Sequence, residues 1–240
     1  YKVMEEALEK ANLSFDEISY VVATGYGRIN VPFADKQVTE ITCHAQGVLS
    51  IFPNMRTTID IGGQDAKGIK VSNGKVVDFV MNDKCAAGTG RFLEVIADTL
   101  CLKLEEMGEL SLKSQNKIKI SNTCTIFAEQ EIISHIANGV LIEDILAGLH
   151  NSIVSRVYLM SQRLKIEPDV VLTGGVAKNI GVVKAMEEHI GHPILVSPEP
   201  LLTGAIGAAI LGKNLTMKAL ERGEPLERGG RYLKETTFFT

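Results

Sequence analysis

The sequence lacks the features that would place it in a membrane, on nucleic acid or around a zinc ion. No apolar run reaches the roughly 18 residues that a membrane-spanning helix needs. Positive charge is not in excess, because 25 Lys and Arg stand against 29 Asp and Glu, for a formal net charge of −4. No CxxC pair or His-rich zinc pattern is present. We therefore expect neither a membrane nor a nucleic acid as a partner.

Cysteine is also scarce, and the four cysteines are spaced too widely for a disulfide scaffold. Hydrophobic residues make up 45% of the chain and charged residues 22%, which is ordinary for a soluble globular protein, so we expect a cytoplasmic location. The N-terminus has neither an initiator Met nor a basic segment followed by an apolar one. We expect it to be the start of a fragment and not a signal peptide.

The hydrophobic pattern predicts three strands in succession, followed by helices that alternate with strands. Asn73-Gly74 lies between two strand-like runs, which is a strong signal for a β-hairpin. This order indicates a mixed sheet covered by helices, an α/β architecture. The expected helices are 2–12, 35–49, 88–101, 125–138, 142–165, 178–190 and 203–212, and the expected strands are 18–23, 57–61, 66–71, 75–80, 170–172 and 193–196.

Three glycine-rich junctions are candidates for a nucleotide site. In the first, Gly62 and Gly63 end a predicted strand, where backbone N–H groups can approach phosphate oxygens. Asp60 would hold Mg²⁺ through water, and Gln64 or Asp65 would orient an attacking water. The alternative is an ordinary glycine turn with solvated polar residues, and this motif alone does not separate the two.

The second junction joins a predicted strand to a helix through Gly174 and Gly175, with Lys178 in the same loop. It would let a nucleotide lie flat against the backbone, although it lacks the GxxxxGK[ST] spacing of a P-loop. The third junction begins at Thr203-Gly204, and close packing of helices through small residues explains it equally well. The three junctions in this order are more specific than any one of them.

Cys85 and Cys124 each precede a predicted helix, whose unpaired N–H groups and partial positive charge favour a thiolate. Thiolates ligate metal, but an iron–sulfur cluster usually takes four, so two copies of the chain would have to share one. The alternative is two unrelated buried cysteines. Cys101 is expected to be a small buried hydrophobe on a helix. Cys43 beside His44 is not expected to be catalytic, because adjacent helical residues point in different directions.

Five stretches resemble the BadF/BadG/BcrA/BcrD ATPase family, and within it the activators (component A) of 2-hydroxyacyl-CoA dehydratases. They are Ala23–Arg28, Asp60–Lys67, Met81–Arg91, Asn122–Glu129 and Thr173–Asn179. The resemblance covers about residues 1–212. It implies an actin/Hsp70/sugar-kinase-like two-domain α/β fold, divided here into residues 1–56 and 57–212, with a tail at 213–240. The family's first strands, whose Asp-x-Gly-Ser/Thr loop contacts the terminal phosphates, are expected to precede this chain.

The resemblance also implies a homodimeric ATPase that binds ATP or ADP with Mg²⁺. It implies one oxygen-sensitive 4Fe–4S cluster between the subunits, held by Cys85 and Cys124 of each. Reduced ferredoxin or flavodoxin would supply an electron, and ATP would drive it to a 2-hydroxyacyl-CoA dehydratase (component D). The candidate catalytic residues are Asp60, Gln64 and Asp65, and the candidate nucleotide-binding residues are Gly62, Gly63, Gln64, Gly174, Gly175, Lys178 and Gly204.

Three other functions fit parts of this pattern. A nucleotide-binding subunit of a benzoyl-CoA reductase belongs to the same family and would form a permanent complex with partner subunits. A sugar or acyl-phosphate kinase of the same fold would need neither Cys85 nor Cys124 and would be active in air. A nucleotide-sensing scaffold would bind ATP weakly and would not turn it over.

Overall fold

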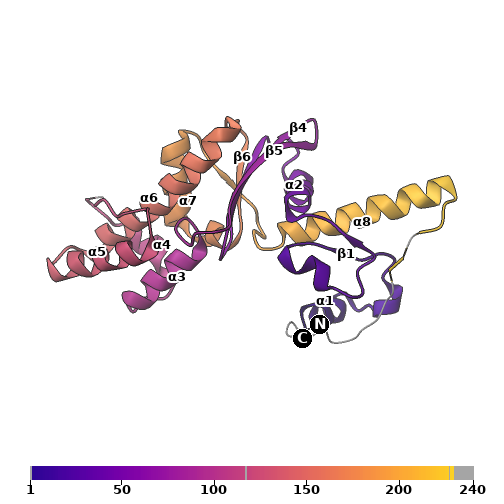
Figure 1. Ribbon diagram of the computed structural model, residues 1–240, viewed down its shortest axis with the longest axis horizontal. Coiled ribbons are helices and arrows are strands. Elements are labelled where there is room, and N and C mark those ends of the chain that lie inside the picture. Colours follow the sequence, from indigo (N-terminus) through magenta and orange to yellow (C-terminus); the bar gives the residue numbers. More distant parts are fainter. Residues whose placement is uncertain (1, 117, 227, 230–240) are drawn as a thin grey trace. The chain divides into compact units, whose positions relative to one another are not determined.

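The computed structural model describes residues 2–116, 118–226 and 228–229 (Figure 1). These residues form two compact units, one drawn from the described part of 1–47 and 204–240 and the other from the described part of 48–203. The chain passes from one unit to the other at residues 47/48 and again at 203/204. The sequence-based division, with boundaries after residues 56 and 212, stays a prediction.

A five-stranded mixed sheet forms the centre of the 48–203 unit. Its order is β5-β4-β3-β6-β7, with β3 antiparallel to β4, β4 antiparallel to β5, and β6 parallel to both β3 and β7. The predicted mixed sheet is therefore confirmed, including the hairpin at Asn73-Gly74, where both residues have positive φ. The strands are β3 (Thr57–Ile61), β4 (Ala66–Ser72), β5 (Lys75–Asn82), β6 (Val170–Thr173) and β7 (Leu195–Val196).

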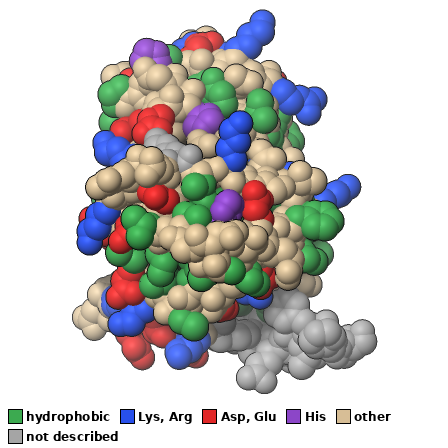
Figure 2. Space-filling view, turned by 90° about the vertical axis from the view of Figure 1, so that its left-hand side faces the viewer, with side chains coloured by type: hydrophobic (Ala, Val, Ile, Leu, Met, Phe, Trp, Pro, Cys, Tyr) green, Lys and Arg blue, Asp and Glu red, His purple; other side chains and the backbone are tan. Residues whose placement is uncertain are grey.

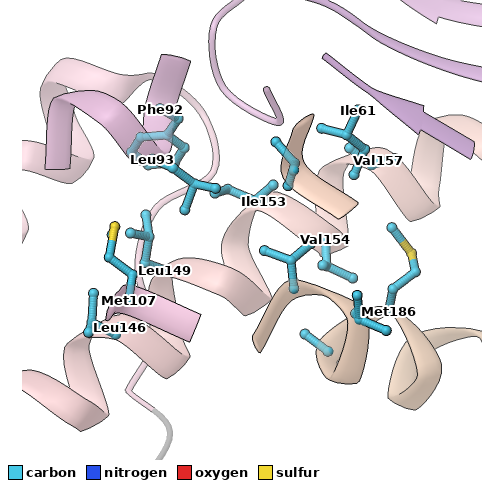
Figure 3. Packing of buried hydrophobic residues seen from close by; sticks show 14 of the residues in the cluster. Ile61, Phe92, Leu93, Met107, Leu146, Leu149, Ile153, Val154, Val157 and Met186 are labelled. Carbon is cyan, nitrogen blue, oxygen red and sulfur yellow. The ribbon is translucent and has the colours of Figure 1, made fainter. Parts of the chain in front are cut away.

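Helix α6 (Ile142–Ser161) forms the middle of the hydrophobic core of this unit. Between Asp144 and Val154 it buries residues around its whole circumference, as expected where neighbours enclose a helix, whereas Leu159 near its end is exposed. Figure 3 shows Leu149, Ile153 and Val154 of α6 among side chains from the sheet and from other helices, including Ile61 and Phe92. The other helices of the unit are α3 (Gly90–Thr99), α4 (Glu106–Ser111), α5 (Thr125–Ala137) and α7 (Ile180–Ile190).

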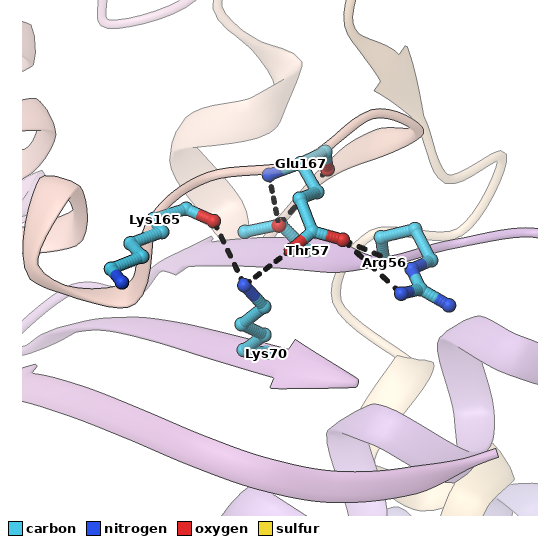
Figure 4. A network of polar contacts seen from close by, with 5 residues as sticks. All are labelled: Arg56, Thr57, Lys70, Lys165 and Glu167. Atoms are coloured by element: carbon cyan, nitrogen blue, oxygen red, sulfur yellow. Dashed lines mark hydrogen bonds and ion pairs between the residues drawn. The ribbon is translucent and has the colours of Figure 1, made fainter. Parts of the chain in front are cut away.

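A polar network fixes the connection that leads into β6 (Figure 4). The Thr57 hydroxyl donates to the Glu167 carbonyl at 3.0 Å and accepts from the Glu167 N–H at 3.1 Å. The Glu167 carboxylate pairs with Lys70 of β4 and with Arg56, and these hydrogen bonds, led by the one from Lys70, lower its pKa. The network holds the start of β6 beside the start of β3, and the two glycine junctions of this unit follow the other ends of these strands.

The other unit contains α1 (Lys2–Ala11), a short parallel pair of β1 (Val22–Ala23) and β2 (Lys36–Gln37), α2 from Glu40, and α8 to Arg222. The backbones of α2 and α8 touch at Gly207, because a Cβ there would lie only 1.8 Å from the Cys43 carbonyl oxygen. Close packing through a small residue therefore occurs in the third glycine-rich segment.

Short 3-10 helices occur in both units. They are Phe15–Glu17 and Tyr26–Asn30 in this unit, and Gln162–Leu164 and Gly175–Lys178 in the 48–203 unit.

Several predicted elements differ from the structure. The helix predicted at 35–49 begins at Glu40 and ends at Ile51, because residues 36–37 pair with β1. The last helix runs from Thr203 to Arg222, so it includes the first part of the predicted tail. Tail residues 227 and 230–240 lie outside the described residues. Among the described residues, no helix is both long and apolar enough to cross a bilayer.

Candidate functional site

A cavity of about 230 Å³ lies within the 48–203 unit where the two glycine junctions meet. Three predicted nucleotide-binding residues, Gly63, Gly175 and Lys178, line it. The apolar part of its wall comes from α3, the loop after it and Val176, and its charged part from two carboxylates and one ammonium. The remaining lining residues are Gly90, Leu93, Glu94, Leu104, Glu105, Val176 and Asn179.

The first glycine junction is hydrogen-bonded to the start of α3. The Gly90 N–H donates to the Gly62 carbonyl and the Arg91 N–H to the Gly63 carbonyl, both at 2.8 Å. A Cβ on Gly90 would lie 3.2 Å from the Gly62 oxygen, from the Gly63 Cα and from a Val176 methyl. Only glycine fits here without displacing backbone, so the contact between the two segments depends on it.

The second glycine junction brings the end of β6 against the end of β3. Gly174 has a φ of +83°, and a Cβ there would lie 2.3 Å from the Ile61 carbonyl oxygen and 3.0 Å from Asp60 Oδ1. The preceding hydroxyl, Thr173 Oγ1, donates to Asp60 Oδ1 at 2.9 Å. Gly174 therefore does not line the cavity but permits the close approach of strands that forms it.

The two predicted acidic residues share one lysine. Lys67 Nζ lies 2.6 Å from Asp65 Oδ2 and 3.6 Å from Asp60 Oδ2, and all three residues are at most 7% exposed. The lysine compensates charge that burial would otherwise penalise. The acidic pair is thus held beside a cation of the chain itself, while Gln64 in the same loop is exposed.

Gly204 lies in the other unit, in the first turn of α8. A Cβ there would come within 3.3 Å of His44 Nε2 on α2. Its nearest neighbour is therefore a helix packing partner, and its role toward a nucleotide stays a prediction.

Asn179 both lines the cavity and caps α7. Its Oδ1 accepts the Val182 N–H at 3.1 Å, so its Nδ2 is the atom that faces His150 Nε2, at 3.2 Å. The His150 ring must therefore be neutral at Nε2 to accept this N–H. Burial lowers the pKa of His150 to about 4, which agrees with a neutral ring. His150 Nδ1 is buried and has no hydrogen-bond partner among the described residues.

Cys85 is half-buried and lies in the loop between β5 and α3. Asn82 Nδ2 donates to the carbonyl oxygens of Cys85 and Ala87, at 3.0 and 3.2 Å. Thr89 Oγ1 donates to the Ala86 carbonyl at 2.7 Å. The loop that presents this thiol is therefore ordered by side chains at both of its ends.

Cys124 is also half-buried and is the residue immediately before α5, as predicted. Its extended backbone leads into a first turn without a side-chain cap. The preceding segment is held by Glu131, which accepts the Ser121 N–H at 2.8 Å, and by Ser152 of α6, whose hydroxyl donates to the Ser121 carbonyl at 3.1 Å.

Arg156 of α6 contacts both cysteine loops. Its Nη1 donates to the Asn122 carbonyl at 2.8 Å, and its aliphatic carbons lie beside Gly88. The described residues contain no group of three or more His, Cys, Asp or Glu side chains placed to hold a metal ion. The role of Cys85 and Cys124 as metal ligands stays a prediction.

Residues 1–212 match the BadF/BadG/BcrA/BcrD ATPase family. The chain belongs to this family. It is 50% identical over 210 residues to the 2-hydroxyisocaproyl-CoA dehydratase activator of Clostridioides difficile, covering 87% of this chain and 79% of that one. It is 50% identical to the (R)-2-hydroxyglutaryl-CoA dehydratase activating ATPase of Acidaminococcus fermentans over 86% of this chain and 80% of that one.

Among solved structures, the chain is similar to the activator of the 2-hydroxyisocaproyl-CoA dehydratase from Clostridium difficile with bound ADPNP. The TM-score is 0.88 and the sequence identity 45%, covering 98% of this chain and 85% of that chain. The family and fold that the sequence predicted are therefore confirmed.

Sequence reasoning missed four residues that hold this ATPase's site together. Lys67 and Gly90 lie inside stretches that carried the resemblance, but no role was assigned to them. His150 and Arg156 lie on α6, far in sequence from the loops they contact, so only the folded structure brings them there. Cys101, expected to be buried on a helix, is instead exposed and follows α3 with a φ of +54°.

We predict that Lys67→Met lowers the free energy of unfolding by about 3 kcal/mol, because it leaves two buried carboxylates without their cation. Lys75, which is exposed in the β4–β5 hairpin, provides the matched control, and Lys75→Met is expected to change little. Urea unfolding followed by circular dichroism measures both. Equal midpoints for the two variants would show that Lys67 does not stabilise the carboxylates.

We also predict that stability falls as the pH is lowered from 6.5 toward 4, in part through His150. The unfolded ring takes up a proton near pH 6.5, whereas the folded ring does so only near pH 4. In that window each pH unit removes up to about 1.4 kcal/mol from the free energy of unfolding. Urea unfolding at pH 7, 6 and 5 should show a shallower slope for His150→Gln than for the wild type.

The exposed His192 provides the control for this titration, and His192→Gln is expected to retain the wild-type slope. If His150→Gln also kept that slope, the buried imidazole would not be the group responsible.

Proposed function

We propose that this chain is an ATPase that activates a 2-hydroxyacyl-CoA dehydratase by delivering one electron to it. The observation that carries the proposal is the junction at the start of α3, where the glycine loop at the cavity is hydrogen-bonded to the segment that presents Cys85. A site for a phosphate and a site for a redox metal then share one piece of backbone. The names of the relatives, which are activators of such dehydratases, support the same function.

We assign ATP or ADP to the cavity between the glycine junctions. Gly63 and Gly175 expose backbone to it, Lys178 brings a positive charge, and Val176 and Leu93 supply apolar wall. The relative solved with bound ADPNP supports a nucleotide of this class. Mg²⁺ would bind beside the phosphates, with Asp60 as its water-mediated ligand. Gln64, which is exposed in the same loop, would orient the attacking water, with Asp65 as the other candidate.

The two cysteine loops fit one half of a 4Fe–4S site. Both thiols are half-buried, neither forms a disulfide, and each lies on a loop that reaches Arg156. Four thiolates are needed, so a second copy of the chain would supply Cys85 and Cys124 again. When bound, such a cluster supplies one-electron transfer at low potential. The residues of this chain order the loops and expose the thiols to the partner.

An apolar face beside Cys124 supports the homodimer. Helix α5 begins directly after this cysteine. Three of its large hydrophobic side chains are exposed, Ile126 by 64%, Phe127 by 66% and Ile133 by 45%. Figure 2 views the side on which α5 lies in Figure 1, and hydrophobic side chains reach the surface there. Contact with a second copy would remove this area from water where the shared site requires the two chains to meet.

The electron balance is simple. Reduced ferredoxin or flavodoxin loses one electron, the dehydratase (component D) gains it, and ATP with water becomes ADP and phosphate. A nucleotide contributes only if it favours one of two conformations. The contact between Gly62 and Gly90 provides the physical means, because a phosphate that shifts the glycine loop also pulls on the start of α3. A cytoplasmic location agrees with thiols that must stay reduced.

Anaerobic purification with iron and sulfide analysis tests the metal assignment. We expect about four irons per dimer in the wild type, and their loss in Cys85→Ala and Cys124→Ala. Cys101→Ala, which changes an exposed thiol, is the matched control and should retain the iron. A folded wild-type protein without iron would remove the electron-transfer function and leave a nucleotide-binding protein.

A second experiment tests the coupling between nucleotide and cysteine loop. We predict that ATP changes the alkylation rate of Cys85 in the wild type by at least about threefold, roughly 0.7 kcal/mol. In Gly90→Ala this change should disappear, because the added methyl group pushes the Gly62-Gly63 loop away from α3. Gly27→Ala is the control, since nothing lies within 4 Å of a Cβ there. An ATP effect that survives in Gly90→Ala would exclude this route.

A further inference from the structure

We propose that Arg156 is a positioning residue that fastens both cysteine loops of one chain to α6, so that the two thiols are presented as a single half-site. This inference rests on the proposed function, because it assigns Arg156 to the same metal site. Arg156 would touch no iron itself and would act through the two loops.

The contact with the Cys124 loop is polar. Arg156 Nη1 donates to the Asn122 carbonyl at 2.8 Å, two residues before the cysteine. One turn earlier on α6, the Ser152 hydroxyl donates to the Ser121 carbonyl at 3.1 Å. Two successive carbonyls are therefore held by donors one turn apart on one helix. Of these donors only the guanidinium is charged, and its hydrogen bond is the stronger one.

The contact with the Cys85 loop is apolar. A Cβ on Gly88 would lie 3.3 Å from Arg156 Cδ and 3.5 Å from its Cγ. Gly88 follows Cys85 by three residues and has a φ of +89°, so the loop turns where the arginine stem covers it. Arginine combines a long aliphatic stem with a forked donor, which lets one side chain make both contacts.

The cavity beside Arg156 is lined by no acidic side chain, among those that the structure describes, that would compete with the Asn122 carbonyl for the guanidinium. This cavity has a volume of about 250 Å³ and is lined by Met81, Asn82, Val157 and Met160. Among the described residues that line this cavity, Arg156 alone is charged. Asn82 fixes the other side of the Cys85 loop by donating to the Cys85 carbonyl. Arg156 and Asn82 therefore contact the Cys85 loop from two sides, and the other residues that line the cavity are neutral.

Because one contact is polar and the other apolar, different substitutions of Arg156 can remove them separately. Arg156→Met keeps a stem against Gly88 and removes the donor to Asn122, whereas Arg156→Ala removes both. Arg156→Lys keeps a stem, a donor and the charge. Arg163, exposed in the 3-10 helix that follows α6, gives the control Arg163→Ala.

The first measurement uses the iron-free protein and a neutral maleimide, with the two thiols resolved by peptide mass. We expect Arg156→Ala to accelerate labelling of both Cys85 and Cys124 by about tenfold, Arg156→Met to accelerate only Cys124, and Arg156→Lys and Arg163→Ala to match the wild type. Tenfold corresponds to about 1.4 kcal/mol. Unchanged labelling in Arg156→Ala, or a change confined to one thiol in that variant, overturns the proposal.

The second measurement uses the anaerobically purified dimer. Arg156→Met should release iron to a chelator about tenfold faster than the wild type and alter the EPR signal of the reduced protein, and Arg156→Lys should restore both. Iron release and EPR signal unchanged in Arg156→Met overturn the proposal. A wild type without iron would instead sink the proposed function, while the maleimide experiment would still decide whether Arg156 fastens the loops.

Discussion

The contact between the Gly62-Gly63 loop and the first residues of α3 is the constraint on which the site depends. Two backbone hydrogen bonds of 2.8 Å join a strand end to a helix start. Backbone donors cannot rotate away as side chains do, so the separation of the two segments is fixed by main-chain geometry. A Cβ at Gly90 would lie 3.2 Å from this loop, so the two segments would have to move apart slightly. The cavity wall, the end of β3 and the loop that carries Cys85 are all placed relative to this contact.

Three buried charged side chains lie close together behind the first glycine junction. Two buried carboxylates, Asp60 and Asp65, face one buried ammonium, Lys67, so the chain itself supplies most of the compensation. The net charge of the three groups is −1, which agrees with the Mg²⁺ proposed to bind beside the phosphates. Across the core, His150 is kept neutral by burial. A protonated ring there would lose the Asn179 contact and add an unpaired charge to the hydrophobic core.

Local signals in the sequence predicted the local features of this structure. The Asn73-Gly74 turn, the glycine ends of β3 and β6 and the start of α5 after Cys124 are each encoded by neighbouring residues. Gly63, Gly175 and Lys178, chosen from two separate motifs, line one cavity. Features that depend on distant pairing were not predicted. Residues 36–37 carry a helical pattern but pair with β1, because tertiary contacts override weak local preference.

Helix α6 explains why contacts so far apart in sequence belong to one site. His150, which holds Asn179 at the cavity, and Arg156, which touches both cysteine loops, are six residues apart on it, or about 9 Å along its axis. The helix is continuous from Ile142 to Ser161, and most of its residues up to Val154 are buried in the packed core, so it moves as a rigid element. A change at Asn179 therefore either breaks its contact with His150 or moves Arg156 with it. The hydrogen bond between Gly90 and Gly62 links the cavity to the Cys85 loop without involving α6. Cys124 has no such backbone link to the cavity among the described contacts, and α6 is its connection.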